Sequence, residues 1–344
     1  MSILGKDLFA HDNNFLRFTA RFAEGTVIID AWEYKLAELV TSFLNYDSTE
    51  YIASVTEMKA MIESGNFESC YRQIEKIHRL IRAMPLFCNR HEQHQLLDLR
   101  LAMIENYNIL EAVDYQDLLS DYFELAEDLL VVQERYSWFV KELFARQALK
   151  RDSDQYAWQL TDNNLDAFVS GKNLGLRREV DPAASTVQYE LVTASDGTPR
   201  LFEKRHFTTL LDFVYTDLMH GLMYGHAPKQ CKLCGRFFLQ ERGFVYEYCV
   251  GSAPDESGKT CREVGARQSF RAKVKSSEIW QIHQRAYKKY YARVMKKHMT
   301  KAEFNVWAQK AERLRDNALE NERGAKRAGR EYNYVAFAAS LNDR

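Results

Sequence analysis

The sequence predicts a mainly α-helical protein in which a small cysteine-rich module is followed by further helices. Three observations support this prediction. Glycine and proline are scarce, with 15 and 5 in 344 residues, which favours long uninterrupted helices over a β architecture with many turns. Apolar residues recur at three- and four-residue steps through much of the chain. Four of the six cysteines fall within residues 231–261.

The amino-terminal half is expected to be helical from about Phe15 to Leu165. Residues 70–84 give a clear example, because Tyr71, Ile74 and Ile81 fall on one side of a helix together with Ile77. Further helices are expected at residues 31–43, 55–63, 94–107 and 115–148. Residues 1–170 hold 28 Asp and Glu against 16 Lys and Arg, a net charge of −12. We therefore predict an acidic helical domain over residues 1–170.

The segment from residue 171 to 228 is predicted to form a β-hairpin and a connecting helix. Residues 170–182 are rich in glycine and charge, which marks the domain boundary. Two β-prone runs, VQYELV and PRLFEKRHF, flank Asp196-Gly197, and this arrangement is typical of a hairpin. The helical periodicity of residues 208–224 ends at Gly225, as expected at the end of a helix.

Residues 229–265 carry the pattern of a zinc module. Cys231 and Cys234 are separated by two residues, so their thiolates can bind one ion from a tight turn that Gly235 allows to close. The residues between Cys234 and Cys249 predict a strand, a turn and a second strand, and Cys261 opens a helix. Four cysteine ligands leave no open coordination position, so we expect one structural Zn²⁺ per chain. Four ordinary cysteines, some of them buried, are the alternative interpretation.

The last segment, residues 266–344, is predicted to be helical and basic. Helices are expected at residues 265–275 and 277–298. Thr300 and Glu303 form a capping box at the start of a third helix, which we expect to end near Gly324. The aromatic residues of the tail, including Tyr332 and Phe337, suggest that it docks onto these helices.

Much of the positive charge of this chain is concentrated in one segment. Residues 262–301 contain 12 Lys and Arg against Glu263 and Glu278 alone, a net charge of +10. A cationic stripe next to a rigid zinc module can neutralise several phosphates of a nucleic acid. The candidate contacts are Arg267, Arg271, Lys273, Lys275, Arg285, Lys289, Arg293, Lys296 and Lys297.

Two other interpretations of the basic stripe stay open. The first is that the stripe is an ordinary solvated helix face. The second is that it docks on the acidic domain of the same chain, because the net charges of −12 and +10 are nearly complementary. Trp280, Tyr287, Tyr290 and Tyr291 interleave with the stripe, and we expect these aromatic side chains in the core rather than stacked on bases.

A resemblance to known proteins rests on the same residues. The stretch from CKLCGRFF to TCREVGARQSFR, followed by AYKKYYARVMKKH and EFNVWAQKAERLRD, resembles a bacterial family of unknown function that joins a helical amino-terminal half to such a cysteine module. More distantly it is similar to the CGNR-type zinc fingers of bacterial regulators, although Arg-Glu-Val-Gly follows Cys261 where that finger has Gly-Asn-Arg. The resemblance implies zinc ligands at Cys231, Cys234, Cys249 and Cys261 and a role in DNA binding.

We therefore expect a zinc-finger protein that binds nucleic acid, with DNA favoured. Its helical half would bind a protein partner or a second copy. A protein-interaction or scaffold protein, in which zinc only stabilises the fold, is the alternative. No nucleophile–base pair or open metal site is evident, so we do not expect an enzyme. We expect a cytoplasmic protein that does not span a membrane. No run of about 18 apolar residues and no secretory signal occurs, and the clustered cysteines favour a reducing compartment.

Overall fold

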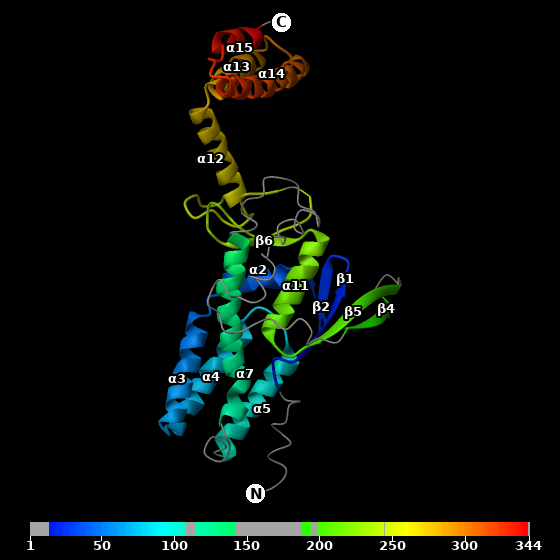
Figure 1. The fold of residues 1–344 in the computed structure, drawn as a ribbon, viewed down its shortest axis with the longest axis vertical. Helices are drawn as coiled ribbons and strands as arrows, with labels where there is room; N and C mark the ends of the chain where they lie inside the picture. Colours follow the sequence, from blue (N-terminus) through cyan, green and yellow to red (C-terminus); the bar gives the residue numbers. More distant parts are fainter. Residues whose placement is uncertain (1–13, 108–114, 142–186, 194–198, 244, 343–344) are drawn as a thin grey trace. The chain divides into compact units, whose positions relative to one another are not determined.

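The fold is described from a computed structural model for residues 14–107, 115–141, 187–193, 199–243 and 245–342. The chain divides into two compact units, Met1–Cys249 (unit 1) and Val250–Arg344 (unit 2). Both units are mainly helical, which confirms the predicted fold class, and Figure 1 shows their helices and the smaller amount of strand.

Unit 1 combines an antiparallel sheet, a short second sheet and a group of helices. Its strands are β1 (Phe18–Ala23), β2 (Thr26–Ile29), β3 (Trp32–Lys35), β4 (Val187–Thr193), β5 (Pro199–Phe207), β6 (Ala227–Gln230) and β7 (Phe237–Gln240). Its helices are α2 (Glu38–Asn45), α3 (Thr49–Glu63), α4 (Phe67–Ala83), α5 (His91–Tyr107), α7 (Tyr115–Val131), the π-helical turn η2 (Val132–Tyr136), α8 (Ser137–Phe139) and α11 (Leu210–Tyr224).

The first part of the amino-terminal half is β-structure, and the prediction of helix from Phe15 through residue 35 was wrong. On β1 the buried residues Phe18, Ala20 and Phe22 alternate with half-exposed ones, which is the period of a strand. Gly25, with φ +80°, joins β1 to β2. A Cβ at this position would lie 3.0 Å from the ring of Tyr224, so both backbone conformation and space favour glycine.

The five-stranded sheet has the order β3-β2-β1-β5-β4, and each pair is antiparallel. The predicted hairpin is confirmed as β4 and β5, in which Leu191 lies opposite Leu201. Because β5 also pairs with β1, the sheet contains strands from both sides of residue 170. The division into residues 1–170, 171–228, 229–265 and 266–344 stays a prediction.

The helices α3, α4, α5 and α7 lie side by side beside the sheet (Figure 1). The stripe predicted on α4 is confirmed, since Ile74, Ile77 and Ile81 are buried. The helices predicted at residues 55–63 and 94–107 are also confirmed. The long helix predicted at residues 115–148 is present as α7, η2 and α8 up to Phe139, and its last residues lie outside the described part of the chain.

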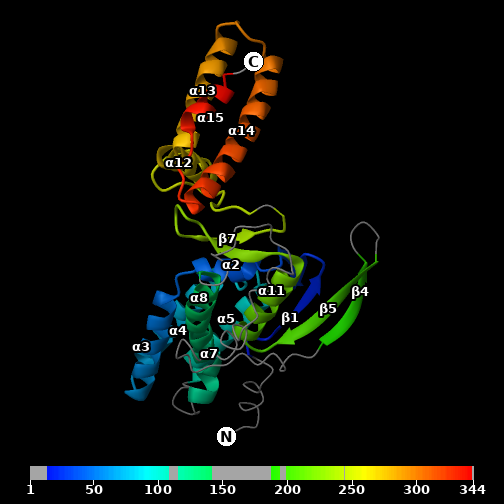
Figure 2. The ribbon, with the colours of Figure 1, turned by 45° about the horizontal axis from the view of Figure 1, so that its top comes forward.

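Unit 2 consists of α12 (Cys261–Ser276), α13 (Glu278–Met295), α14 (Lys301–Arg327) and α15 (Tyr334–Ser340). In Figure 2, α13 and α14 run in opposite directions with α15 next to them. The predicted capping box is present, since Thr300 and Glu303 bond each other's backbone N–H groups. The predicted stop at Gly324 was wrong, because a single exposed glycine costs a helix only about 1 kcal/mol. The tail docks as expected, with Phe337 buried.

None of the helices in the described residues combines the length and the apolar character needed to cross a membrane.

Candidate metal centre

The first two cysteines of the cluster lie in the turn of a β-hairpin. β6 and β7 pair antiparallel with Gln230 opposite Phe237, and residues 231–236 connect them. Within this turn the N–H of Gly235 donates to the carbonyl of Cys231 over 3.0 Å, and the N–H of Cys231 donates to the carbonyl of Arg236 over 2.8 Å. Gly235 has φ +74°, and no atom would crowd a Cβ there, so its conformation alone favours glycine.

The first strand predicted between Cys234 and Cys249 is present as β7, but the predicted second strand was wrong. Among the described residues, β7 pairs with the preceding strand β6, and residues 245–249 form no strand. The sequence of β6, Ala-Pro-Lys-Gln, lacks the β-branched and aromatic residues that mark a strand. β6 nevertheless buries its first three residues in unit 1, which explains how this segment becomes a strand.

Two contacts that the sequence did not indicate hold the hairpin in place. The side-chain amide of Asn45, the last residue of α2, donates to the carbonyl of Phe237 and accepts from its N–H, both over 2.8 Å. Glu247 accepts from the ammonium groups of Lys229 over 2.7 Å and Lys232 over 2.6 Å. Burial opposes the charge of Glu247, but the hydrogen bonds from the two lysines lower the pKa of this carboxyl group.

The loop that leads to the last cysteine is closed by its own backbone. The N–H of Ala253 donates to the carbonyl of Lys259 over 2.9 Å, and the N–H of Cys261 donates to that of Gly251 over 2.8 Å. Thr260 then caps α12 together with Glu263 in a second capping box. Cys261 is therefore the first residue of α12, as the sequence predicted.

The four cysteines form one cluster. The sulfur atoms of Cys231, Cys234, Cys249 and Cys261 all lie within 4.8 Å of one another, and the residues other than Cys234 are buried. The Sγ atoms of Cys234 and Cys249 are 3.7 Å apart. In a tetrahedral site with Zn–S bonds of about 2.3 Å, neighbouring sulfurs lie about 3.8 Å apart. The four thiols thus lie close enough to hold one metal ion.

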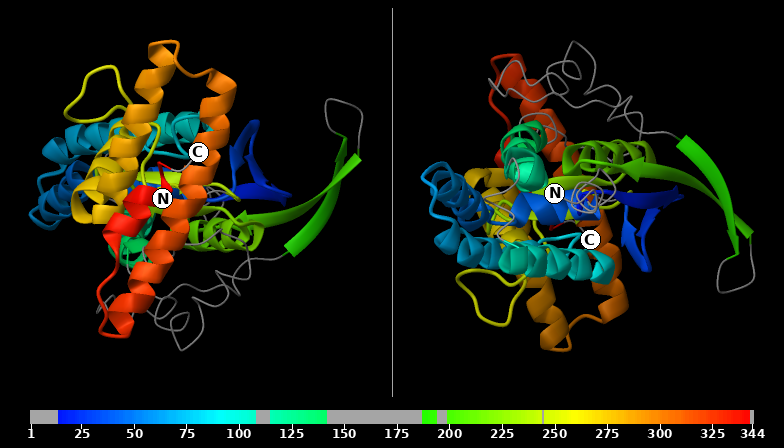
Figure 3. Two further views of the ribbon diagram at one scale, coloured as in Figure 1. Left: turned by 90° about the horizontal axis from the view of Figure 1, so that it is seen from above. Right: turned by 90° about the horizontal axis from the view of Figure 1, so that it is seen from below.

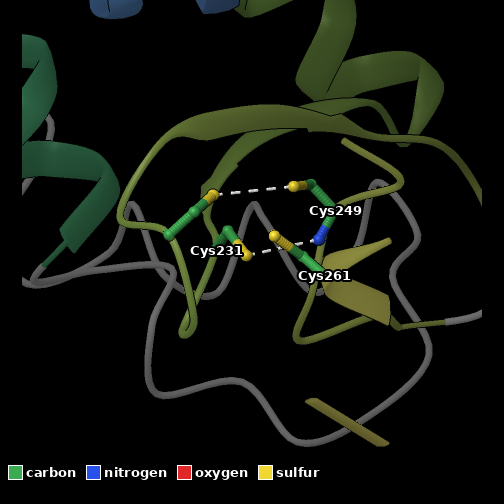
Figure 4. A group of neighbouring side chains, drawn as sticks. Cys231, Cys249 and Cys261 are labelled. Carbon is green, nitrogen blue, oxygen red and sulfur yellow. Dashed lines mark hydrogen bonds between the residues drawn. The ribbon is translucent and has the colours of Figure 1, made fainter. Parts of the chain in front are cut away.

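Backbone N–H groups around the cluster favour the thiolate form. The N–H of Cys249 points at the Sγ of Cys231 over 3.4 Å (Figure 4). Burial alone would raise the pKa of Cys231, but the N–H groups of Cys234, Cys249 and Leu233 lower this pKa to about 7. The thiolate is the form that binds metal. The chemistry and the geometry of the donor set therefore fit a metal such as zinc.

Residues 178–336 match a family of unknown function, DUF6076. The match covers all four cysteines and the basic helices, and it agrees with the expected resemblance to a family of unknown function. A comparison with curated proteins and one with solved structures gave no match. The similarity to CGNR-type zinc fingers stays a prediction.

Residues 178–336 also contain the nine candidate contacts to nucleic acid, all of them in unit 2. Four lie on α12 (Arg267, Arg271, Lys273, Lys275), three on α13 (Arg285, Lys289, Arg293) and two directly after α13 (Lys296, Lys297). All are exposed except the half-buried Arg267 and Arg293.

Three of the nine are engaged within unit 2. Arg267 forms an ion pair with Glu256, Lys289 donates to the side chain of Asn342 over 2.8 Å, and the guanidinium of Arg293 lies 4.8 Å from the ring centre of Tyr290. Within the described part of the chain, the other six form no ion pair. The pairing of Arg267 with Glu256 was not predictable from the sequence pattern.

The aromatic residues of α13 pack mainly among themselves and against α14. Tyr290 stacks on Trp307 with ring centres 4.0 Å apart, and Tyr287 contacts Phe304 edge to face. Trp280 lies under the guanidinium of Arg315 at 4.4 Å. Tyr290 and Tyr287 therefore belong to the core of unit 2, as expected. Trp280 and Tyr291 lie outside this core cluster, and Tyr291 keeps 49% of its surface exposed.

Proposed function

We propose that this chain is a zinc-finger protein that binds nucleic acid, with duplex DNA as the favoured target. Cys231, Cys234, Cys249 and Cys261 would hold one Zn²⁺ whose role is structural, because four thiolates fill a tetrahedral coordination shell. The basic side chains of α12 and α13 would contact phosphates. We thus propose a binding protein rather than an enzyme, and we propose that it acts in the cytoplasm.

The observation that carries the proposal is the exposure of α12. This helix has 16 residues, of which only Cys261, Val264 and Gly265 are buried. A helix of a globular protein normally buries an apolar stripe along its whole length. α12 instead presents exposed cations at Arg271, Lys273 and Lys275, and such a surface suits a polyanion.

Arg285 on α13 and Lys296 and Lys297 directly after it are further exposed cations. Six of the nine candidate residues form no ion pair in the described part of the chain, so their charges are available to phosphates. Contacts to about six phosphates would give a slope of about −5 for log K against log salt concentration. Binding should therefore weaken strongly between low and physiological salt.

A protein-interaction or scaffold role is the second candidate, and the charge distribution favours it. Residues 1–170 carry −12 and residues 262–301 carry +10, so the basic surface is also complementary to an acidic protein surface, including that of its own chain. In this role zinc only stabilises the fold, and the helical amino-terminal half binds a protein partner or a second copy.

An electrophoretic mobility titration at two salt concentrations separates the two candidates. We expect wild-type protein to shift duplex DNA at low salt. The triple variant Arg271→Gln, Lys275→Gln, Arg285→Gln should lose most of this affinity and reduce the salt slope by about 3. Its zinc content should stay unchanged, because none of the three side chains belongs to the cysteine cluster.

The matched control removes three exposed charges from another surface of unit 2. Lys310, Arg313 and Arg323 lie on α14, outside the proposed contact surface. Their replacement by glutamine should leave the shift unchanged. Absence of a shift with both duplex DNA and RNA at low salt would contradict the nucleic-acid proposal and favour the protein-interaction role.

A further inference from the structure

The five-stranded sheet of unit 1 ends in two edges of different character. The β3 edge is only four residues long, carries Glu33 and Lys35, and is tied by an ion pair of 2.7 Å between Lys35 and Glu241. Short length and charge protect an edge strand from pairing with another chain. The β4 edge has seven residues, Val187–Thr193, without lysine, proline or glycine. Among the described strands, β4 pairs with β5 alone.

The β4 edge also carries exposed apolar side chains on one face. Val187, Tyr189 and Leu191 alternate along β4 with 44%, 69% and 74% of their surface exposed, and Leu201, opposite Leu191, is 61% exposed. The register places them on the face that carries Phe18 and Phe22 on β1.

On β1 this face is covered. The rings of Phe18 and Phe22 contact Phe213 of α11 at 5.1 and 6.5 Å. In both views of Figure 3 the β4–β5 ribbon extends away from the helices of unit 1. The face that forms the core on β1 therefore continues uncovered onto β4.

We propose that β4 pairs antiparallel with β4 of a second copy of this chain, so that two sheets join into one across a two-fold axis at Tyr189. A two-fold axis normal to a sheet generates an antiparallel pair and keeps the same face of both copies on the same side. Val187, Tyr189 and Leu191 of the two copies then become cross-strand neighbours.

The sequence of β4 is self-complementary in this register. Val187 lies opposite Leu191 of the second copy, Tyr189 opposite Tyr189, and Gln188 opposite Glu190. Aromatic and β-branched pairs of this kind stabilise a sheet, whereas like charges directly opposite each other destabilise it. Moving the axis by one residue, which shifts the register by two, would place Glu190 opposite Glu190. The axis at Tyr189 avoids this, and each Glu190 keeps its own partner Arg21 at 2.9 Å.

The available area indicates a weak dimer. A large apolar side chain exposes about 200 Å² when fully free, so the three exposed apolar side chains of β4 offer on the order of 370 Å² per copy. Two copies together reach about 750 Å² at most, which is the size of a weak or transient interface. The ladder hydrogen bonds add to this, and we expect dissociation at micromolar concentrations.

Sedimentation velocity of the full-length protein over a range of concentrations, up to about 100 µM, tests the pairing. We expect a concentration-dependent dimer. Leu191→Lys should weaken it at least about a hundredfold, because a charge would then lie in the apolar row. The matched control is Met223→Lys on α11, since Met223 is 73% exposed and lies outside β4. It should leave dimerisation unchanged.

The position of the axis is tested by two charge variants at one residue. Tyr189→Lys and Tyr189→Glu should each be monomeric, because like charges would meet at the axis. An equimolar mixture of the two should dimerise, because lysine then lies opposite glutamate. Circular dichroism of each variant checks that the fold is retained.

Three results would overturn the proposal. One is a wild-type chain that stays monomeric at about 100 µM, which would mean that β4 is covered by another part of this chain or by another protein. Another is a dimer that withstands Leu191→Lys. The third is a folded pair of Tyr189 variants that stays monomeric in the mixture.

Discussion

Removal of the metal should unfold the loop from residue 241 to 260 while the cores of both units stay folded. The core of unit 1 extends from Phe15 to Ala227, and the core of unit 2 begins at Ile279, so neither contains this loop. In the described part of the loop, only Cys249 and Ala253 are buried. Burial of one alanine methyl group contributes less than about 1 kcal/mol, whereas a structural zinc site contributes about 10 kcal/mol or more.

Hydrogen exchange followed by mass spectrometry measures this effect at individual segments. The amides of Gly235, Ala253 and Cys261 donate within the turn and the loop, so their exchange reports whether these remain closed. We expect at least a thousandfold faster exchange after zinc removal by a chelator, corresponding to about 4 kcal/mol. The substitution Cys234→Ser should act in the same direction. Amides of α4 should keep their protection.

A cysteine outside the cluster provides the control. Cys88 is exposed, and its replacement by serine should change neither the zinc content nor the exchange of the loop. The reasoning is refuted if the purified chain holds much less than one zinc per chain. It is equally refuted if chelation and Cys234→Ser both leave the loop protected.

Two further predictions concern groups in the core of unit 1 and beside the metal centre. Asn45→Ala removes both hydrogen bonds to the backbone of Phe237, so we expect a loss of about 1–2 kcal/mol in stability and release of zinc at a lower chelator concentration in a competition titration. The second prediction concerns Asp217. Burial raises the pKa of its carboxyl group to about 7, although the hydrogen bonds from the N–H groups of Ala37 and Val40 lower this pKa. The native chain thus keeps a proton that the unfolded chain loses near pH 4. The free energy of unfolding should then fall by up to about 4 kcal/mol as the pH rises from 4 to 7. Asp217→Asn should remove this fall, and equal pH dependence of both proteins in urea unfolding would contradict the assignment.

Features that depend on neighbouring residues were predictable from the sequence. The apolar stripe of α4, the hairpin of β4 and β5, and the capping box at Thr300 are each fixed within about twenty residues. The strands β1–β3 were missed because their stability depends on a partner far along the chain. β1 pairs with β5, more than 180 residues later, and an isolated hairpin is marginally stable at best.

The candidate metal centre also combines features set by nearby residues with features that depend on distant ones. The spacing of the cysteines indicated the cluster, because two thiols in a tight turn are a local pattern. The support of the cluster could not be predicted. Asn45 lies about 190 residues before the strand that it binds, and nothing in its surroundings distinguishes it from an ordinary residue at the end of a helix.

The composition of the cluster indicates where function lies in this chain. If the four thiols hold one ion as proposed, they leave no position for a substrate or an activated water, so the metal would act only through the backbone that it holds. That backbone includes the first turn of α12, because Cys261 is its first residue and Thr260 and Glu263 cap it. Glu256 in the preceding loop also binds Arg267 of the same helix. The start of α12 is thus tied to the loop that carries the last cysteine of the cluster. This connection is why a site without chemistry of its own would matter for the binding of nucleic acid.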